Sequence, residues 1–161
     1  MERVTVREAT ADELAVVQAV NLAAFESIHE SFADLLGPGI NALVYPDWRE
    51  SQQRELSELV AKPNSVLFVA VSNLEIVGFV VVELNFETQV GELCIIAVHP
   101  DSRRQGIGDA LNDRAIQVMT ESGMRLAELG TGGDQAHAAA RRSYERVGYT
   151  ALPLVRYYKE L

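Results

Sequence analysis

The chain has 161 residues, of which 48% are hydrophobic and 23% are charged, and it carries a formal net charge of −9. This composition fits one globular domain with a sizeable core and excludes a disordered chain. A single cysteine excludes an internal disulfide and a cysteine-based zinc cluster, so a reducing, cytoplasmic compartment is expected.

The first third of the chain is expected to hold one strand and two helices. A capping box of Thr10 and Glu13 precedes apolar residues at helical spacing, which predicts a helix start. Glycine and proline breaks follow, and a second helical pattern ends before Pro63. The predicted elements are a strand at 4–7, a helix at 11–28, a broken connector at 33–47 and a helix at 47–61.

The middle of the chain reads as three strands, because β-branched and aromatic residues are concentrated there. The predicted strands are 66–71, 76–84 and 90–98, with a hairpin turn at 72–75. Cys94 in the third strand is expected to be a small buried apolar residue rather than a nucleophile.

Helices and strands alternate in the last third. Gly123 and Gly148 each follow a helical pattern as a C-terminal cap, and Pro153 interrupts the final strand. The predicted elements are a helix at 107–122, a strand at 125–129, a glycine-rich loop at 130–134, a helix at 135–147 and a strand at 151–158. Together these elements predict a single α/β (α+β) domain over 1–161, with a mixed, mostly antiparallel sheet of six to seven strands flanked by four helices.

Neither a membrane nor a nucleic acid is an expected partner. No apolar run approaches the ~20 residues of a membrane span, and no basic run exceeds two residues. Acidic residues are concentrated in the first 60 positions, which hold 11 Asp and Glu against four Arg. That imbalance favours a cationic partner, although an acidic excess also serves solubility alone.

The sequence RRQGIG, residues 103–108, lies between a strand and a helix. At such a junction the first backbone N–H groups of the helix lack partners and favour an anion. Gly106 and Gly108 let a phosphate approach the backbone closely, and Arg103 and Arg104 add charged donors. The order of glycines fits neither a Walker loop nor a dinucleotide fingerprint. A helix entry with two exposed arginines is the alternative.

This stretch resembles the Arg/Gln-x-x-Gly-x-Gly/Ala signature of the GNAT superfamily of N-acetyltransferases, in which the loop binds the pyrophosphate of acetyl-CoA. IIAVHP at 95–100 is similar to the family strand that pairs with pantetheine, and SYERVGY at 143–149 is similar to its last helix. The resemblance implies acetyl-CoA as co-substrate and no metal. The coenzyme contacts it implies are Ile96, Ala97, Val98, Arg103, Arg104, Gln105, Gly106, Ile107, Gly108 and His137. His137 departs from the family, which often has Asn there.

The resemblance also implies catalytic roles. Tyr144 occupies the family's last-helix tyrosine and is expected to be the acid for the departing thiolate. Glu128, an acidic residue within a short apolar strand, is the preferred base for the acceptor amine, and Glu83 and Glu92 compete for that role. Ordered water without a single essential base is a further alternative.

The acceptor side is expected near the broken connector. Phe25 and His29, with Phe32, Tyr45 and Trp48, flank it and are predicted to line the acceptor pocket, with core packing as the alternative. His29 and His99 lack the partner spacing of a metal site.

The sequence therefore predicts an acetyl-CoA-dependent N-acetyltransferase that acts directly on a primary amine, in a small molecule or a peptide. The alternatives are a non-catalytic acyl-CoA sensor of the same fold, a protein N-terminal or lysine acetyltransferase, and a Rossmann-type nucleotide-binding domain. A homodimer that pairs the final strand across its interface is possible in this interpretation.

Overall fold

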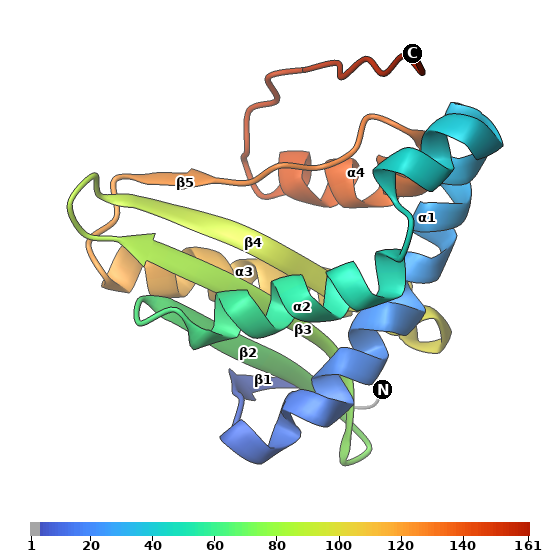
Figure 1. Ribbon diagram of the computed structural model, residues 1–161. Coiled ribbons are helices and arrows are strands. Elements are labelled where there is room, and N and C mark those ends of the chain that lie inside the picture. The colour runs from blue at the N-terminus through green and yellow to red at the C-terminus, as the bar shows by residue number, and fades with distance from the viewer. Residues whose placement is uncertain (1–3) are drawn as a thin grey trace.

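A computed structural model of the chain describes residues 4–161, so the first three residues of the expected domain lie outside the described part. Its centre is one five-stranded sheet in the order β1-β2-β3-β4-β5 (Figure 1). The strands are β1 (Thr5–Glu8), β2 (Ser65–Ser72), β3 (Glu75–Asn85), β4 (Val90–Val98) and β5 (Leu126–Glu128). The first four strands pair antiparallel, and β5 pairs parallel to β4.

Helices cover both faces of this sheet. The helices are α1 (Leu14–Val44), α2 (Trp48–Ala61), α3 (Ile107–Glu121) and α4 (Ala138–Arg146), with 3-10 turns η1 (Ala11–Glu13), η2 (Pro100–Ser102) and η3 (Gln135–His137). In Figure 1, α1 and α2 lie on one side of the sheet and α3 lies on the other. Helix α4 contacts α3 and η3. Within residues 4–161, no helix combines the length and apolarity that a bilayer span requires.

The hydrophobic core has two parts, one on each face of β3. Val80 and Val82 pack with α3, whereas Phe79 and Val81 pack with α1 and α2. This division follows from the two-residue period of a strand, and it explains why β3 reads as a continuous apolar run. Helix α3 approaches closely at Gly78, where an added Cβ would lie 3.1 Å from the Leu111 side chain and 3.2 Å from the Ile107 side chain.

The mixed α/β class and most elements agree with the sequence prediction. The hairpin turn between β2 and β3 has Asn73 and Leu74 at φ 50° and 67°, as a two-residue primed turn requires. At the start of η1, the Glu13 carboxylate accepts a hydrogen bond from the Thr10 backbone N–H at 2.9 Å. The expected helix start is therefore present, with a 3-10 turn ahead of α1.

The prediction of a broken connector over residues 33–47 is wrong in extent. Helix α1 continues to Val44 and changes direction at Gly37, whose φ of 73° and ψ of 166° are non-helical. Glycine adopts this conformation without a steric penalty, and Pro38 then occupies the first turn of the second limb, where proline is tolerated. The glycine and proline signals thus mark a bend that places two helical limbs against the start of α2.

The expected sheet of six to seven strands is also wrong, since the described part of the chain has five. The strand predicted at 151–158 is absent, and this tail is exposed. Pro153 removes one ladder donor, and the three-residue β5 offers only a short edge for pairing. Instead the tail returns to the second limb of α1, where Glu160 lies against Gly39.

Candidate active site

Strands β4 and β5 pair over only part of their length. The ladder joins Val90–Glu92 to Leu126–Glu128 and ends there, while β4 continues for six more residues. The His99 N–H donates to Val77 on the β3 side at 2.8 Å. Because backbone groups alternate along a strand, the N–H groups of Ile96 and Val98 face the opposite, open edge. Ile96 and Val98, two of the predicted coenzyme contacts, thus lie along an unpaired stretch of backbone.

The loop 103–106 reaches α3 through two residues in the left-handed region. Arg104 has φ 64° and Gly106 has φ 78°, and the first helical hydrogen bond runs from the Ala110 N–H to the Gly106 carbonyl. The N–H groups of Ile107 and Gly108 precede that bond and are left for an outside acceptor. A Cβ at Gly108 would meet only the Val98 side chain, at 3.9 Å, so open space lies in front of this turn.

The cations around this turn have different partners. Arg103 Nη2 donates to the Ala24 carbonyl of α1 at 3.0 Å, which fastens the loop to that helix. Asp109, in the first turn of α3, accepts from Ser143 Oγ at 2.6 Å and from Arg146 Nη2 at 2.7 Å. These hydrogen bonds hold the pKa of Asp109 below its ordinary value. They also fix α4 against the start of α3.

Tyr144 lies on α4 beside Ser143 and is buried, with 8% of its surface exposed. Its ring meets Tyr149 edge to face at 6.1 Å. Burial raises the pKa of Tyr144 to about 12. The phenol is therefore neutral at physiological pH and able to donate a hydrogen bond.

Three glutamates lie side by side across the sheet. The strand registers pair Glu83 with Glu92 and Glu92 with Glu128. Their neighbours Leu84, Leu93 and Ala127 pack with α3. Because side chains alternate between faces, the glutamate row points to the α1–α2 side. The sequence presents Glu83 and Glu92 as alternatives to Glu128 for the role of base, whereas the structure brings all three together.

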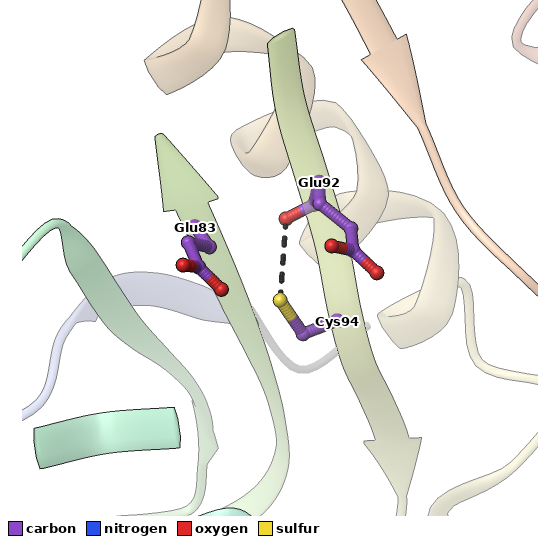
Figure 2. A group of neighbouring side chains, drawn as sticks. All are labelled: Glu83, Glu92 and Cys94. Atoms are coloured by element: carbon purple, nitrogen blue, oxygen red, sulfur yellow. Dashed lines mark hydrogen bonds between the residues drawn. The ribbon is translucent and has the colours of Figure 1, made fainter. Parts of the chain in front are cut away.

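A cysteine and a lysine border this row. The Cys94 thiol donates to the Glu92 carbonyl at 3.6 Å, and its sulfur lies within 4.8 Å of carboxylate oxygens of Glu83 and Glu92 (Figure 2). Burial raises the pKa of Cys94 to about 11, so the thiol stays protonated. Lys62 Nζ lies 2.7 Å from the Glu83 carboxylate. No local sequence signal identifies Lys62, because its partner is 21 residues away in another element.

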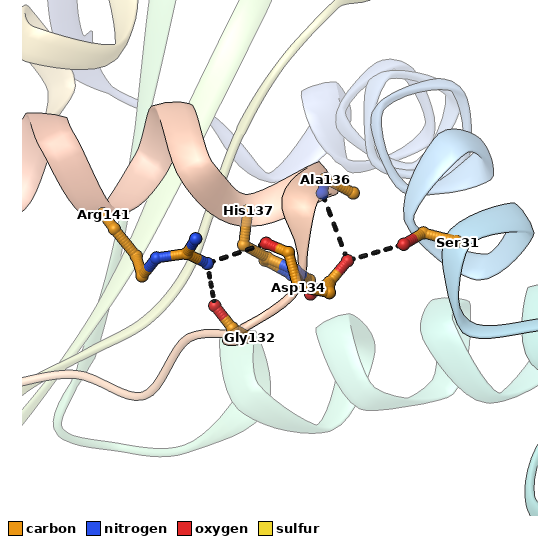
Figure 3. Close-up of polar contacts among 6 residues, drawn as sticks. All are labelled: Ser31, Gly132, Asp134, Ala136, His137 and Arg141. Atoms are coloured by element: carbon orange, nitrogen blue, oxygen red, sulfur yellow. Dashed lines mark hydrogen bonds and ion pairs between the residues drawn. The ribbon is translucent and has the colours of Figure 1, made fainter. Parts of the chain in front are cut away.

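The buried Asp134 carboxylate connects helix α1 to the start of η3. Asp134 accepts from Ser31 Oγ of α1 at 2.7 Å and from the Ala136 N–H of η3, and it pairs with His137 Nδ1 (Figure 3). Arg141 closes the same loop through the carbonyls of Gly132 and Asp134 at 2.6 and 2.8 Å. One ring nitrogen of His137 is thus committed to Asp134. The sequence prediction did not include Ser31 or Asp134.

The aromatic residues near the bend of α1 form a continuous cluster. His29 stacks on Trp48 at 4.3 Å, and Phe32 stacks on Tyr45 at 5.3 Å and on His137 at 5.8 Å. Phe25 lies apart from these rings and packs against the core between α1, α2 and the sheet. Four of the five residues predicted to line the acceptor pocket thus form the aromatic cluster, and the fifth, Phe25, contributes to packing.

Comparison with known proteins identifies the family. The model of the acetyltransferase (GNAT) family matches residues 25–149. A mycothiol acetyltransferase from Streptomyces coelicolor is 28% identical over 108 residues, which are 65% of this chain and 34% of that protein. The chain thus spans about a third of the length of this curated relative.

Solved structures share the fold over nearly the whole chain. A transcriptional regulator from Bacillus halodurans C-125 is 26% identical with a TM-score of 0.67, covering 97% of this chain and 100% of that one. The aminoglycoside N-acetyltransferase AAC(6')-Iy, in complex with CoA, is 16% identical with a TM-score of 0.66, covering 99% and 96%. Together with the open β4 edge and the glycine turn, these matches show that the chain belongs to the acetyltransferase (GNAT) family.

Proposed function

We propose that the protein transfers an acetyl group from acetyl-CoA directly to a primary amine of a small, cationic molecule. The observation that carries this proposal is the row of Glu83, Glu92 and Glu128, which adjoins the opening between β4 and β5. A positively charged acceptor and an extended coenzyme can meet at this place.

The donor half rests on the open backbone of β4 and the glycine turn. Pantetheine would pair with the free N–H groups of Ile96 and Val98, and the pyrophosphate would lie at the N–H groups of Ile107 and Gly108. A partly exposed anion site of this kind also gains from the helix dipole. The AAC(6')-Iy structure, with the same fold, holds CoA, which supports this assignment.

The acceptor half rests on charge. An alkylamine with a pKa of ~10.4 arrives protonated at neutral pH and must lose a proton before it attacks. Glu83 is already paired with Lys62, whereas Glu92 and Glu128 have no ion-pair partner within residues 4–161. We assign Glu92 to attraction of the ammonium and Glu128, at the edge of the opening, to removal of its proton, directly or through water.

The neutral amine then attacks the thioester carbonyl carbon, a C–N bond forms and the C–S bond breaks. A backbone N–H of β4 would polarise the carbonyl. The Tyr144 hydroxyl would donate a hydrogen bond to the sulfur as negative charge develops there. Its raised pKa keeps it a neutral donor. The nitrogen is cationic after the attack and loses its second proton, and that proton passes to the sulfur, so that the products are a neutral amide and the CoA thiol.

An assay of CoA thiol release with a panel of mono- and diamines tests the proposal, with thermal stabilisation by CoA measured in parallel. Amine-dependent release together with stabilisation is expected. Stabilisation by CoA without release on any amine would favour a sensor of acyl-CoA. That second candidate has one supporting observation, the similarity to the Bacillus halodurans transcriptional regulator along its whole length.

A further inference from the structure

We propose that a pocket in the bend of α1 is a subsite for an organic cation with N–H donors, an alkylammonium or guanidinium group, and that it holds a distant positive charge of a long, polycationic acceptor. The pocket has a volume of about 240 Å³ and lies between the two limbs of α1 and the start of α2. Its lining residues are Glu26, His29, Glu30, Asn41, Tyr45, Trp48 and Arg49, with Ala33.

The wall of this pocket is a fixed aromatic surface. The rings of His29 and Trp48 are stacked at 4.3 Å with an angle of 15°, and Tyr45 meets His29 edge to face at 5.1 Å. Burial lowers the pKa of His29, so the ring behind Trp48 is uncharged at neutral pH. One face of Trp48 is thereby supported, and the other is left for a cation.

The chain already places a cation of its own on that face. The Arg49 guanidinium carbon lies 4.4 Å from the centre of the Trp48 ring, and Arg49 Nη2 lies 2.6 Å from Glu26 Oε1. Both charged side chains are more than half exposed, at 58% and 56%. An exposed pair of this kind is weak, so an incoming cation can replace Arg49 at little cost.

The rim of the pocket is acidic and includes an unsatisfied acceptor. Glu30 lies one helical turn after Glu26 and forms no ion pair within the described chain. The Asn41 side-chain oxygen is buried without a hydrogen-bond partner there. A ligand with N–H donors and a positive charge satisfies both features, whereas an anion is repelled by the carboxylates.

The pocket is connected to the proposed reaction centre through Phe32. This ring stacks on Tyr45, which lines the pocket, and on His137, which ends η3 directly before the helix of Tyr144. A cation bound at Trp48 lies about 20 Å from the glutamate row, because Trp48 begins helix α2 and Lys62, at the far end of that helix, pairs with Glu83. Its assignment to the acceptor rests on the proposed function, but the binding of a cation does not.

Trp48 is the only tryptophan of the chain, so its fluorescence reports on this pocket alone. Titration of the whole protein without acetyl-CoA compares ethylguanidinium and butylammonium with N-ethylurea, a neutral isostere of ethylguanidinium. We expect a saturable change with the two cations and none with the urea. An equal response to the urea, or no response to either cation, overturns the subsite.

Two charge variants sharpen this titration. Arg49→Gln removes the internal competitor and frees Glu26, so we expect it to tighten cation binding about 3- to 10-fold. Arg54→Gln on the same helix removes an equal charge outside the pocket and should leave the affinity unchanged. Weaker binding by Arg49→Gln, or equal tightening by both variants, contradicts the proposal.

The role in acetyl transfer has a separate readout. For wild type we expect a higher kcat/KM for spermine, a long polyamine, than for 1,5-diaminopentane, which is too short to reach from the pocket to the glutamate row, and we expect Trp48→Leu, but not Arg54→Gln, to abolish that preference. Transfer without a preference for spermine removes the subsite from the acceptor site. If no amine is acetylated, the proposed function fails, and the fluorescence titration still decides whether the subsite binds cations.

Discussion

Glu83 lies opposite Glu92, and not opposite Leu93, because the ladder between β3 and β4 shifts by one residue between Val81 and Val82. Val81 pairs with Ile95, but Val82 pairs with Leu93, so Cys94 is the extra residue of a bulge. A regular ladder would place a glutamate against an apolar residue. The bulge instead creates the glutamate row on the side of the sheet that faces α1 and α2.

Substitution of Gly108 tests the proposed pyrophosphate site at the first turn of α3. Replacing it with valine should reduce CoA affinity at least about 100-fold, because a side chain would occupy the space in front of the first turn of α3. The fold should persist, since a Cβ there meets only Val98 at 3.9 Å. Calorimetric titration with CoA provides the measurement, and Gly133→Ala in the open loop is the control. An unchanged affinity of the Gly108 variant for CoA would refute a pyrophosphate site at this turn.

Tyr144 tests the role of a neutral hydrogen-bond donor. Tyr144→Phe should lower kcat about 10- to 100-fold while leaving the affinity for CoA within about twofold. The exposed Tyr157→Phe serves as the control, with no expected effect. Equal rates of wild type and Tyr144→Phe would leave Tyr144 with a packing role only.

The pH profile adds a second test of Tyr144. Because its pKa is raised to about 12, the phenol stays protonated through the alkaline range. The rate should therefore not fall between pH 8 and about pH 10 through loss of this donor, whereas an ordinary tyrosine begins to ionise there. A loss of kcat in wild type near pH 9 that is absent from Tyr144→Phe would contradict the assignment.

Asp134 tests the connection between α1 and η3. Asp134→Asn should lower the free energy of unfolding by about 1–3 kcal/mol, because a buried acceptor of several hydrogen bonds is replaced by a weaker one. Ser31→Ala removes only one of those bonds and should cost less. Denaturant unfolding monitored by circular dichroism measures both. Equal free energies of unfolding for Asp134→Asn and wild type would show that the hydrogen bonds of Asp134 do not stabilise the fold.

Features encoded within a few consecutive residues could be predicted from the sequence. The glycine turn at 103–108, the hairpin at Asn73 and the helix start at Thr10 each depend on local conformational preference. Such signals do not need a partner elsewhere in the chain, which explains why these elements were placed correctly.

Features that depend on distant partners could not be predicted. The glutamate row requires the bulge at Cys94. The hydrogen bond between Ser31 and Asp134 joins residues that are 103 positions apart. The bend at Gly37 reads as a loop, because the sequence shows the break but not the helical limb after it. Residues 151–158 are predicted to form a strand, yet a strand also needs an edge to pair with.

The most direct test of the account is kcat/KM for an amine acceptor in the double variant Glu92→Gln, Glu128→Gln, with CoA affinity measured on the same samples. Both substitutions keep the shape of the side chains and remove the charge and the base. Glu87→Gln in the β3–β4 turn is the matched control. We predict a loss of at least about 100-fold in kcat/KM, with CoA affinity within about twofold of wild type. An unchanged kcat/KM would contradict the assignment of the glutamate row as the acceptor site.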